Sequence, residues 1–273
     1  VKDGLFKDKE SKDSRDKTIT TRGIAEILPN TFEGCTNLKE LYILGDTSSI
    51  GDYAFKDCTN LETVEISANV NTMGVRPFAG CQNVSYVSFQ DGPNFRCENS
   101  IIYGLNNGAK STVAECLEAR GRTSGSTSVK AEELAGVIGI AKEAFFNTGV
   151  GIVDLKESSI TEVPEYAFAG DTTDKSKNTS GGLTNELFAV YLPKTCQQIK
   201  ENAFKNSKIS AVEIPSSVSY IDPKAFNTTG NSPRDVATDT SIPNDPSVEW
   251  DGIYRDEPHT IEFSCENPST AYM

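Results

Sequence analysis

The sequence holds few of the side chains that most often carry catalysis or bind transition metals. It has one histidine, His259, one tryptophan and two methionines among 273 residues. A single imidazole leaves little room for histidine-based acid–base or metal chemistry. The motifs GxxxxGK(S/T), GxGxxG, GxSxG and HExxH are missing as well. We therefore expect no enzyme, no cofactor and no metal site, and we interpret His259 as a solvated loop residue.

Long apolar runs and an excess of positive charge are also missing. No stretch approaches the roughly 18 apolar residues that a membrane-spanning helix needs. The 39 acidic residues outnumber the 26 lysines and arginines, which gives a formal net charge of −13. Because nucleic acid is bound through basic surfaces, this balance argues against a nucleic-acid partner. Apolar residues still make up 37% of the chain, as in globular proteins.

Cysteine is present in an odd number, seven, so not all thiols can pair within the chain. No CxxC pair occurs, so the usual spacing of a zinc site is missing. Cys35, Cys58 and Cys81 recur every 23 residues, and we expect small buried thiols that pack like alanine or valine. Cys97 and Cys116 are candidates for a disulfide across a hairpin.

A phenylalanine that follows alanine, or a residue in its place, recurs along the chain. The usual interval is 23 residues; one interval of 36 contains an insertion, and one of 67 spans about two atypical coils. These phenylalanines form the predicted structural ladder: Phe32, Phe55, Phe78, Phe145, Phe168, Phe204 and Phe226. A fixed period of this length is the signature of a repeat architecture.

Two further patterns keep the same phase. Beginning six residues after most of these phenylalanines, apolar residues follow the pattern apolar-x-x-apolar-x-apolar, as in Leu61, Val64 and Ile66. The last two apolar positions alternate with an exposed one, which predicts a short strand. Another apolar residue, such as Ile50, precedes each phenylalanine by about five positions.

One such unit cannot bury its own apolar side, but stacked units can. We expect each coil to hold one short strand and one turn of tight helix at the Ala-Phe pair, with parallel strands about 4.8 Å apart. The predicted fold is a solenoid of about seven regular coils, with short parallel strands on one face and short helical turns and loops on the other.

The solenoid is expected over residues 24–263. Residues 1–23 read as a charged lead-in or incomplete cap, and 264–273 as the start of a truncated further coil. Within 94–118, two apolar runs flank Asn107-Gly108, a sequence that predicts a β-hairpin. The polar stretches 171–185 and 227–258 are predicted insertions.

The repeating units resemble those of the BspA-like, or Treponema-type, leucine-rich repeat. The resemblance rests on IGDYAFKDCTNLETVEI at residues 50–66 and on IKENAFKNSKISAVEIPSSVSYIDPKAF at residues 199–226. It implies a leucine-rich-repeat solenoid that is secreted or attached to a cell surface, mostly in host-associated bacteria. It further implies an adhesin-like role without catalysis, because the family motif is structural throughout.

A solenoid sheet presents an extended exposed face, on which a partner would bind. Seven residues lie between the last two apolar positions of successive strands: Tyr42, Glu65, Ser88, Asp154, Tyr191, Glu213 and Glu262. Four of the seven are acidic and two are tyrosines. This composition is typical of a face that meets a basic or sugar partner, and equally of a solvated strand face that keeps the protein in solution.

Two functions remain open at this stage. The first is an extracellular or cell-surface interaction module that binds an unknown protein, or a glycan, on a host or neighbouring cell. The second is a structural or scaffolding segment of a larger secreted protein, whose functional domains lie outside these residues.

Overall fold

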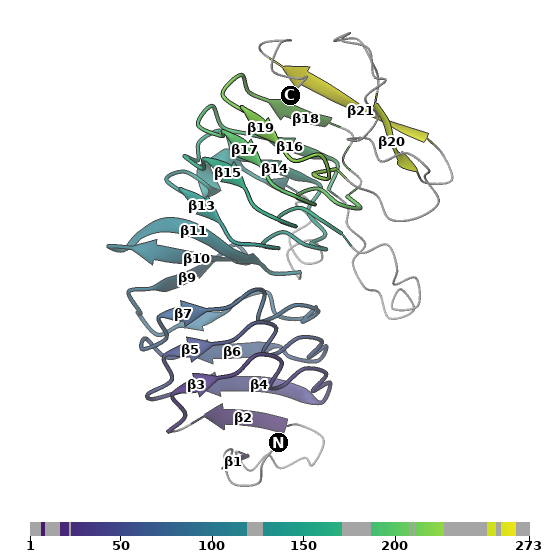
Figure 1. Cartoon of the computed structure of the whole chain (residues 1–273). Coiled ribbons are helices and arrows are strands. Elements are labelled where there is room, and N and C mark those ends of the chain that lie inside the picture. Colours follow the sequence, from purple (N-terminus) through teal and green to yellow (C-terminus); the bar gives the residue numbers. More distant parts are fainter. Residues whose placement is uncertain are drawn as a thin grey trace. The chain divides into compact units, whose positions relative to one another are not determined.

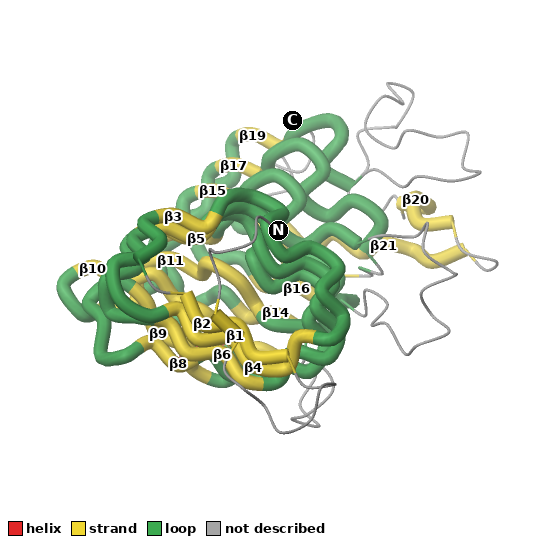
Figure 2. Tube along the Cα trace, turned by 90° about the horizontal axis from the view of Figure 1, so that it is seen from below, coloured by secondary structure: helices red, strands yellow, loops and turns green. Residues whose placement is uncertain are grey.

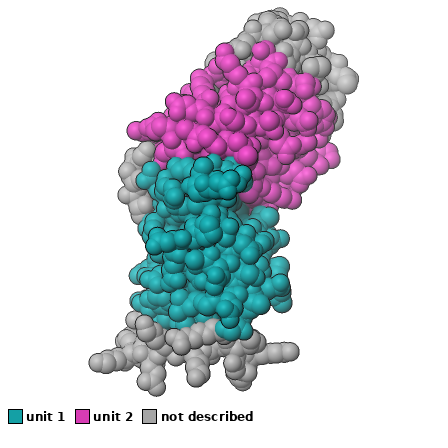
Figure 3. Space-filling model, turned by 90° about the vertical axis from the view of Figure 1, so that its left-hand side faces the viewer, with its two compact units in different colours: residues 1–124 teal, residues 125–273 magenta. Residues whose placement is uncertain are grey.

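The computed structural model describes residues 7–8, 17–21, 23–118, 128–170, 187–207, 209, 211–226, 250–254 and 258–265. The chain divides into two compact units, residues 1–124 and 125–273, which Figure 3 shows in different colours. Each unit is described by itself below. In both, short strands from successive coils are stacked into parallel sheets (Figure 1), which confirms the predicted solenoid.

Unit 1 contains two ladders of strands. The larger sheet runs in the order β1 (Lys7–Asp8), β2 (Lys17–Thr21), β4 (Leu38–Ile43), β6 (Thr63–Ile66) and β8 (Ser88–Phe89). All its neighbours are parallel except β1 and β2. The smaller, parallel sheet holds β3 (Glu26–Ile27), β5 (Ser49–Ile50) and β7 (Thr72–Met73). Figure 2 shows the two ladders on different sides of the coils.

Unit 2 repeats this plan. Its larger sheet runs β12 (Ser128–Val129), β14 (Ile152–Asp154), β16 (Ala189–Tyr191), β18 (Ala211–Ile214), β21 (Pro258–Cys265) and β20 (Trp250–Tyr254). Only the last pair of neighbours in this sheet is antiparallel. The smaller sheet holds β15 (Glu162–Val163), β17 (Gln198–Ile199) and β19 (Tyr220–Ile221). The short strand β13 (Gly139–Ile140) is not part of it.

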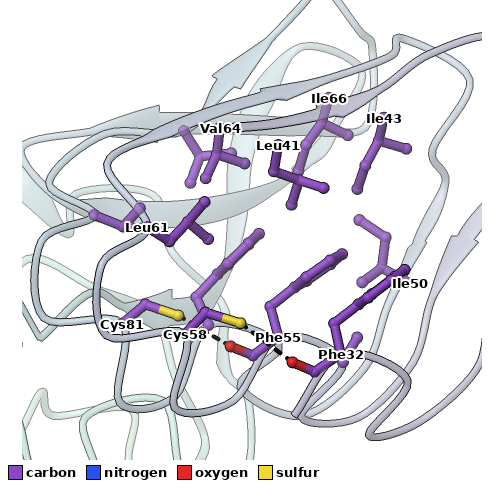
Figure 4. Close-up of a cluster of buried hydrophobic side chains, with 14 of the residues drawn as sticks. Phe32, Leu41, Ile43, Ile50, Phe55, Cys58, Leu61, Val64, Ile66 and Cys81 are labelled. Atoms are coloured by element: carbon purple, nitrogen blue, oxygen red, sulfur yellow. Dashed lines mark hydrogen bonds between the residues drawn. The ribbon is translucent and has the colours of Figure 1, made fainter. Parts of the chain in front are cut away.

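The ladder phenylalanines form the core of each unit. In unit 1 the ring centroids of Phe32 and Phe55 are 5.1 Å apart, and those of Phe55 and Phe78 are 5.6 Å apart. In unit 2 the rings of Phe145, Phe168, Phe204 and Phe226 continue at 5.1, 5.3 and 4.9 Å. Strand residues such as Leu41 and Val64 cover the rings from the sheet side (Figure 4).

Cys58 and Cys81 lie buried beside this stack as small packed thiols, whereas Cys35 is only half-buried. The Cys58 thiol donates a hydrogen bond to the carbonyl of Phe32 at 3.2 Å, and the Cys81 thiol donates to that of Phe55 at 3.1 Å (Figure 4). In unit 2, Thr148 and Ser207 occupy the same position, and their hydroxyls donate to the phenylalanine carbonyl of their own coil. The position therefore selects a small side chain that can satisfy a buried carbonyl.

The Ala-Phe segments are tight turns, so the predicted turn of helix is wrong. The residue two positions before the phenylalanine has a left-handed φ in six coils: Asn30, Tyr53, Arg76, Glu143, Tyr166 and Asn202. The residue two positions after it is left-handed as well at Gly34, Asp57, Gly80, Asn147 and Asn206. Left-handed residues cannot continue a right-handed helix. Among the described residues, the helix that does form is the short 3₁₀ turn η1 (Ala131–Glu133).

These turns let successive coils hydrogen-bond to each other. The N–H of Phe32 donates to the carbonyl of Ala54, and the N–H of Phe55 to that of Pro77, at 2.8 and 2.9 Å. The alternate N–H groups of each turn donate within their own coil, as the N–H of Cys35 does to the carbonyl of Phe32. Each coil thus depends on the next for half of its buried turn amides, which must find acceptors.

Residues 94–118 contain three antiparallel strands. These are β9 (Phe95–Glu98), β10 (Ile101–Asn106) and β11 (Ala109–Cys116), with Asn107-Gly108 at the tip of the hairpin. Cys97 pairs with Ile102 on one side of β10, and Cys116 pairs with Ile101 on the other. Because consecutive residues face opposite sides of a sheet, the proposed Cys97–Cys116 disulfide does not fit.

The predicted boundaries change at both ends. Residues 17–21 form β2, so the sheet begins before residue 24. Residues 250–254, predicted within an insertion, form β20, and His259 lies in β21 rather than in a loop. The insertion at 171–185, residues 227–249 of the second one and residues 266–273 lie outside the described residues.

Replacement of Phe55 by alanine tests the ring stack. Phe55 is fully buried between two rings, so F55A should lower the free energy of unfolding by about 3–5 kcal/mol. Phe188 is 45% exposed, and F188A should change stability by no more than about 0.5 kcal/mol. Denaturant unfolding followed by circular dichroism measures both, and equal losses would contradict the assignment of the core.

Alanine substitutions at two glycines of the same coil position distinguish the cost of a left-handed φ from the cost of a crowded Cβ. Gly34 and Gly80 have φ of 73° and 74°, but a Cβ on Gly34 meets nothing within 4 Å, whereas one on Gly80 meets the Cα of Asp57 at 3.2 Å and its carboxylate closer still. G34A should cost about 1–2 kcal/mol through φ alone. G80A should cost more, because the neighbouring coil must shift. Equal unfolding midpoints for the two variants would count against the close stacking of these coils.

Candidate interaction surface

The outer face of the larger sheet in unit 1 carries one polar row across its strands. Parallel register places Thr20 beside Tyr42, Tyr42 beside Glu65, and Glu65 beside Ser88. All four side chains are half-buried. On each strand, the residues directly before and after them face the core. The alternation of the strand therefore brings the three predicted residues of this unit into one line.

Negative charge surrounds the tyrosine of this row. Glu40 lies two residues before Tyr42 on the same strand and accepts a hydrogen bond from the Thr18 hydroxyl at 2.8 Å. Partial burial raises the pKa of Tyr42, and the charges of Glu40 and Glu65 raise it further. The Tyr42 hydroxyl consequently stays protonated, as a donor amid carboxylates.

The corresponding row in unit 2 consists of Asp154, Tyr191 and Glu213 on neighbouring strands. Here a lysine of the same unit covers the row. The Lys156 ammonium lies 2.9 Å from the Glu213 carboxylate and 4.6 Å from the centroid of the Tyr191 ring. The hydrogen bond to Glu213 raises the pKa of Lys156. The half-exposed pair thus combines an ion pair with a cation–π contact.

The two units share one arrangement. In each, a tyrosine on one strand stands beside a glutamate at the same register on the next, Tyr42 with Glu65 and Tyr191 with Glu213. The contact of Lys156 demonstrates that such a pair accepts an ammonium group. Arg22, at the place in unit 1 that corresponds to Lys156, lies outside the described residues.

One predicted position falls outside the row. The register pairs Glu213 with Ser264 and Ala211 with Glu262, so Glu262 is two residues early. Phe263 and Cys265 pair with Val212 and Ile214, the last two apolar positions of the preceding strand. By backbone register, Ser264 therefore replaces Glu262 in the row.

Sequence reasoning also missed an exposed tyrosine. Tyr86 lies two residues before Ser88, as Glu40 precedes Tyr42, and its side chain is 57% exposed. The apolar-x-x-apolar-x-apolar pattern leaves two outward positions per strand, and the predicted row includes only the second of them. Reading both positions would have found Tyr86 and Glu40.

The described residues also bear on other chemistry. No group of three His, Cys, Asp or Glu side chains among them is placed to hold a metal ion. In the same part of the chain, no helix has the length and apolar character needed to cross a bilayer. Burial raises the pKa of the Cys97 and Cys196 thiols to about 11, so neither is a ready nucleophile at neutral pH.

Several solved structures of bacterial proteins match the chain. The pneumococcal vaccine antigen PcpA matches at 12% identity with a TM-score of 0.50, over 76% of this chain and 57% of its own. A leucine-rich cell surface protein of Faecalibacterium prausnitzii matches at 20% identity with a TM-score of 0.48, over 78% and 59%. The TpLRR protein of T. pallidum matches at 15% identity with a TM-score of 0.37, over 81% and 85%. The chain thus spans less than two thirds of the first two proteins.

The search of the curated proteins gave no match. The family described as "BspA type Leucine rich repeat region" matches in six copies over residues 10–104 and 123–232. The matched residues hold the stacked phenylalanines and both Tyr–Glu pairs. The chain belongs to the BspA-type leucine-rich-repeat family.

Proposed function

We propose that this chain is a non-catalytic interaction module, presented outside the cell or at its surface, that binds a protein partner through the outer face of its larger sheets. The Tyr–Glu pair repeated at one register in both units carries the proposal. Membership of a family that is typically non-catalytic and associated with bacterial surfaces supports it.

The chemistry of the face favours a partner that presents lysine or arginine side chains. Tyrosine offers contact area and a cation-binding ring, and the adjacent glutamate supplies the charge. The contact of Lys156 with Tyr191 and Glu213 supports this choice, because it occupies the pair as a partner's ammonium would. The net charge of −13 also favours encounter with a basic surface.

A binding array tests the proposal. The protein is applied to arrays of surface proteins and of glycans. For each protein that binds, the dissociation constant is then measured with the unmodified chain and with Y42A/Y191A. We expect the double variant to bind at least about tenfold more weakly, as a loss of interface aromatic residues does. Y220A is the matched control, since Tyr220 is 45% exposed but belongs to the smaller sheet. Equal binding by the double variant and by Y220A would remove the sheet face from consideration.

Removal of the lysine tests the cation site. Lys156→Met keeps the aliphatic stem but exposes the Tyr191 ring and the Glu213 carboxylate to a partner. We expect K156M to bind the same basic partner more tightly, and this gain should shrink as salt rises because screening weakens exposed charge pairs. Lys194→Met, which removes another exposed lysine of unit 2, serves as the control. An unchanged or lower affinity for K156M would argue against a basic partner at this pair.

A further inference from the structure

The third coil of unit 1 lacks the neighbour that the first two coils have. The turn amides of coils one and two donate to main-chain carbonyls of the following coil, as Gly34 does to Lys56 and Asp57 to Ala79. After Gly80, the hairpin of β10 and β11 takes the place of a regular coil. An antiparallel hairpin offers no carbonyls at the spacing of an Ala-Phe turn.

Two glutamates of the hairpin arm supply the acceptors instead. The Phe78 N–H donates to the Glu115 carboxyl at 3.4 Å, and the Gly80 N–H donates to that of Glu118 at 2.9 Å. These amides are the equivalents of those that pair Phe55 with Pro77 and Asp57 with Ala79. Side-chain oxygens therefore continue a ladder that the main chain builds elsewhere.

The charges in the contact between the hairpin and the third coil do not balance if both Glu115 and Glu118 are ionised. Arg76 donates to Glu118 at 2.8 Å, and the exposed fractions of Arg76, Glu115 and Glu118 are 5%, 1% and 9%. One guanidinium faces two carboxyl groups, so a second negative charge would be buried without a partner. Among the described residues, the buried thiols of Cys81, on coil three, and Cys97, on β9, also feel the charge of Glu115, and neither supplies a cation.

We infer that the hairpin is a proton-sensitive clamp on the third coil, closed while Glu115 is protonated and opening locally once Glu115 ionises. The protonated carboxyl still accepts the hydrogen bond from the Phe78 N–H and leaves the Arg76–Glu118 pair neutral as a whole. The ionised carboxylate of Glu115 is stabilised more by water than by the buried contact between the hairpin and the third coil. Opening therefore hydrates the Glu115 carboxylate and uncovers Cys97, the buried side chain of β9.

The pH window follows from two pKa values. Burial raises the pKa of Glu115 from 4.5 to about 8, partly offset by Arg76 and the Phe78 amide. A group whose pKa is higher in the closed state stabilises that state fully below the lower pKa, and this stabilisation is lost as pH rises to the higher one. The clamp should therefore weaken from pH 4.5 to about 8 and change little above that.

Alkylation of two buried thiols measures the opening. Cys97 in unit 1 and Cys196 in unit 2 are 5% and 0% exposed, and burial raises the pKa of both to about 11. Labelling of the whole chain with N-ethylmaleimide between pH 6 and 9, quantified for each peptide by mass spectrometry, gives the ratio of the Cys97 rate to the Cys196 rate. The intrinsic pH dependence of a thiol cancels in that ratio. We expect the ratio to rise up to about tenfold per pH unit from pH 6 and to level off above about 8.

Two variants identify the group responsible. Glu115→Gln keeps an oxygen acceptor for the Phe78 amide but cannot ionise, so its ratio should stay flat and low over the same range. Glu98→Gln is the control, because the pKa of Glu98 is lowered by Lys110 and lies below the window, so E98Q should retain the rise. A flat ratio in the unmodified protein overturns the inference without any variant. An equal rise in E115Q overturns it as well.

Discussion

The described regular coils depend on hydrogen-bond acceptors that belong to the next coil or, after the third coil of unit 1, to the hairpin segment. The turn around each ladder phenylalanine directs alternate amides across the gap, as Phe55 does to Pro77. The same spacing brings the rings within 5.1 to 5.6 Å of each other in unit 1, so ring stacking and amide pairing require each other. A single coil would leave both its amides and its phenylalanine exposed, which explains why the repeat exists only as an array.

The period, the buried phenylalanines and the sheet rows could be predicted from the sequence, because they rest on apolar spacing that any stack must keep. The form of the turns could not. Tyr53 and Arg76 adopt left-handed backbone although their residue types show no preference for it, and only the amide ladder between coils imposes that conformation. Glu115 and Glu118 were equally hidden, since no local pattern marks a glutamate that replaces a carbonyl 37 or 38 residues away.

The sheet face was only partly predicted. Alternation placed Tyr42, Glu65 and Ser88 in one row correctly, because regular coils fix their register through the core. The same reasoning misplaced Glu262, which follows a long irregular stretch where the phase is lost. The contact of Lys156 with Tyr191 lay beyond sequence reasoning, because it joins residues from different coils by side-chain reach rather than by period. That contact is the observation from which the preference of this face for a cationic side chain is inferred.

The glutamates that continue the ladder into the hairpin have a consequence for what such a stack can contain. Phe78 and Gly80 keep the turn of a regular coil, the hairpin segment supplies the carboxyl groups that their amides need, and Arg76 of the same coil supplies the cation that pairs with Glu118. An element of different topology thus joins the stack through two side-chain hydrogen bonds and one ion pair, in place of the main-chain bonds between regular coils.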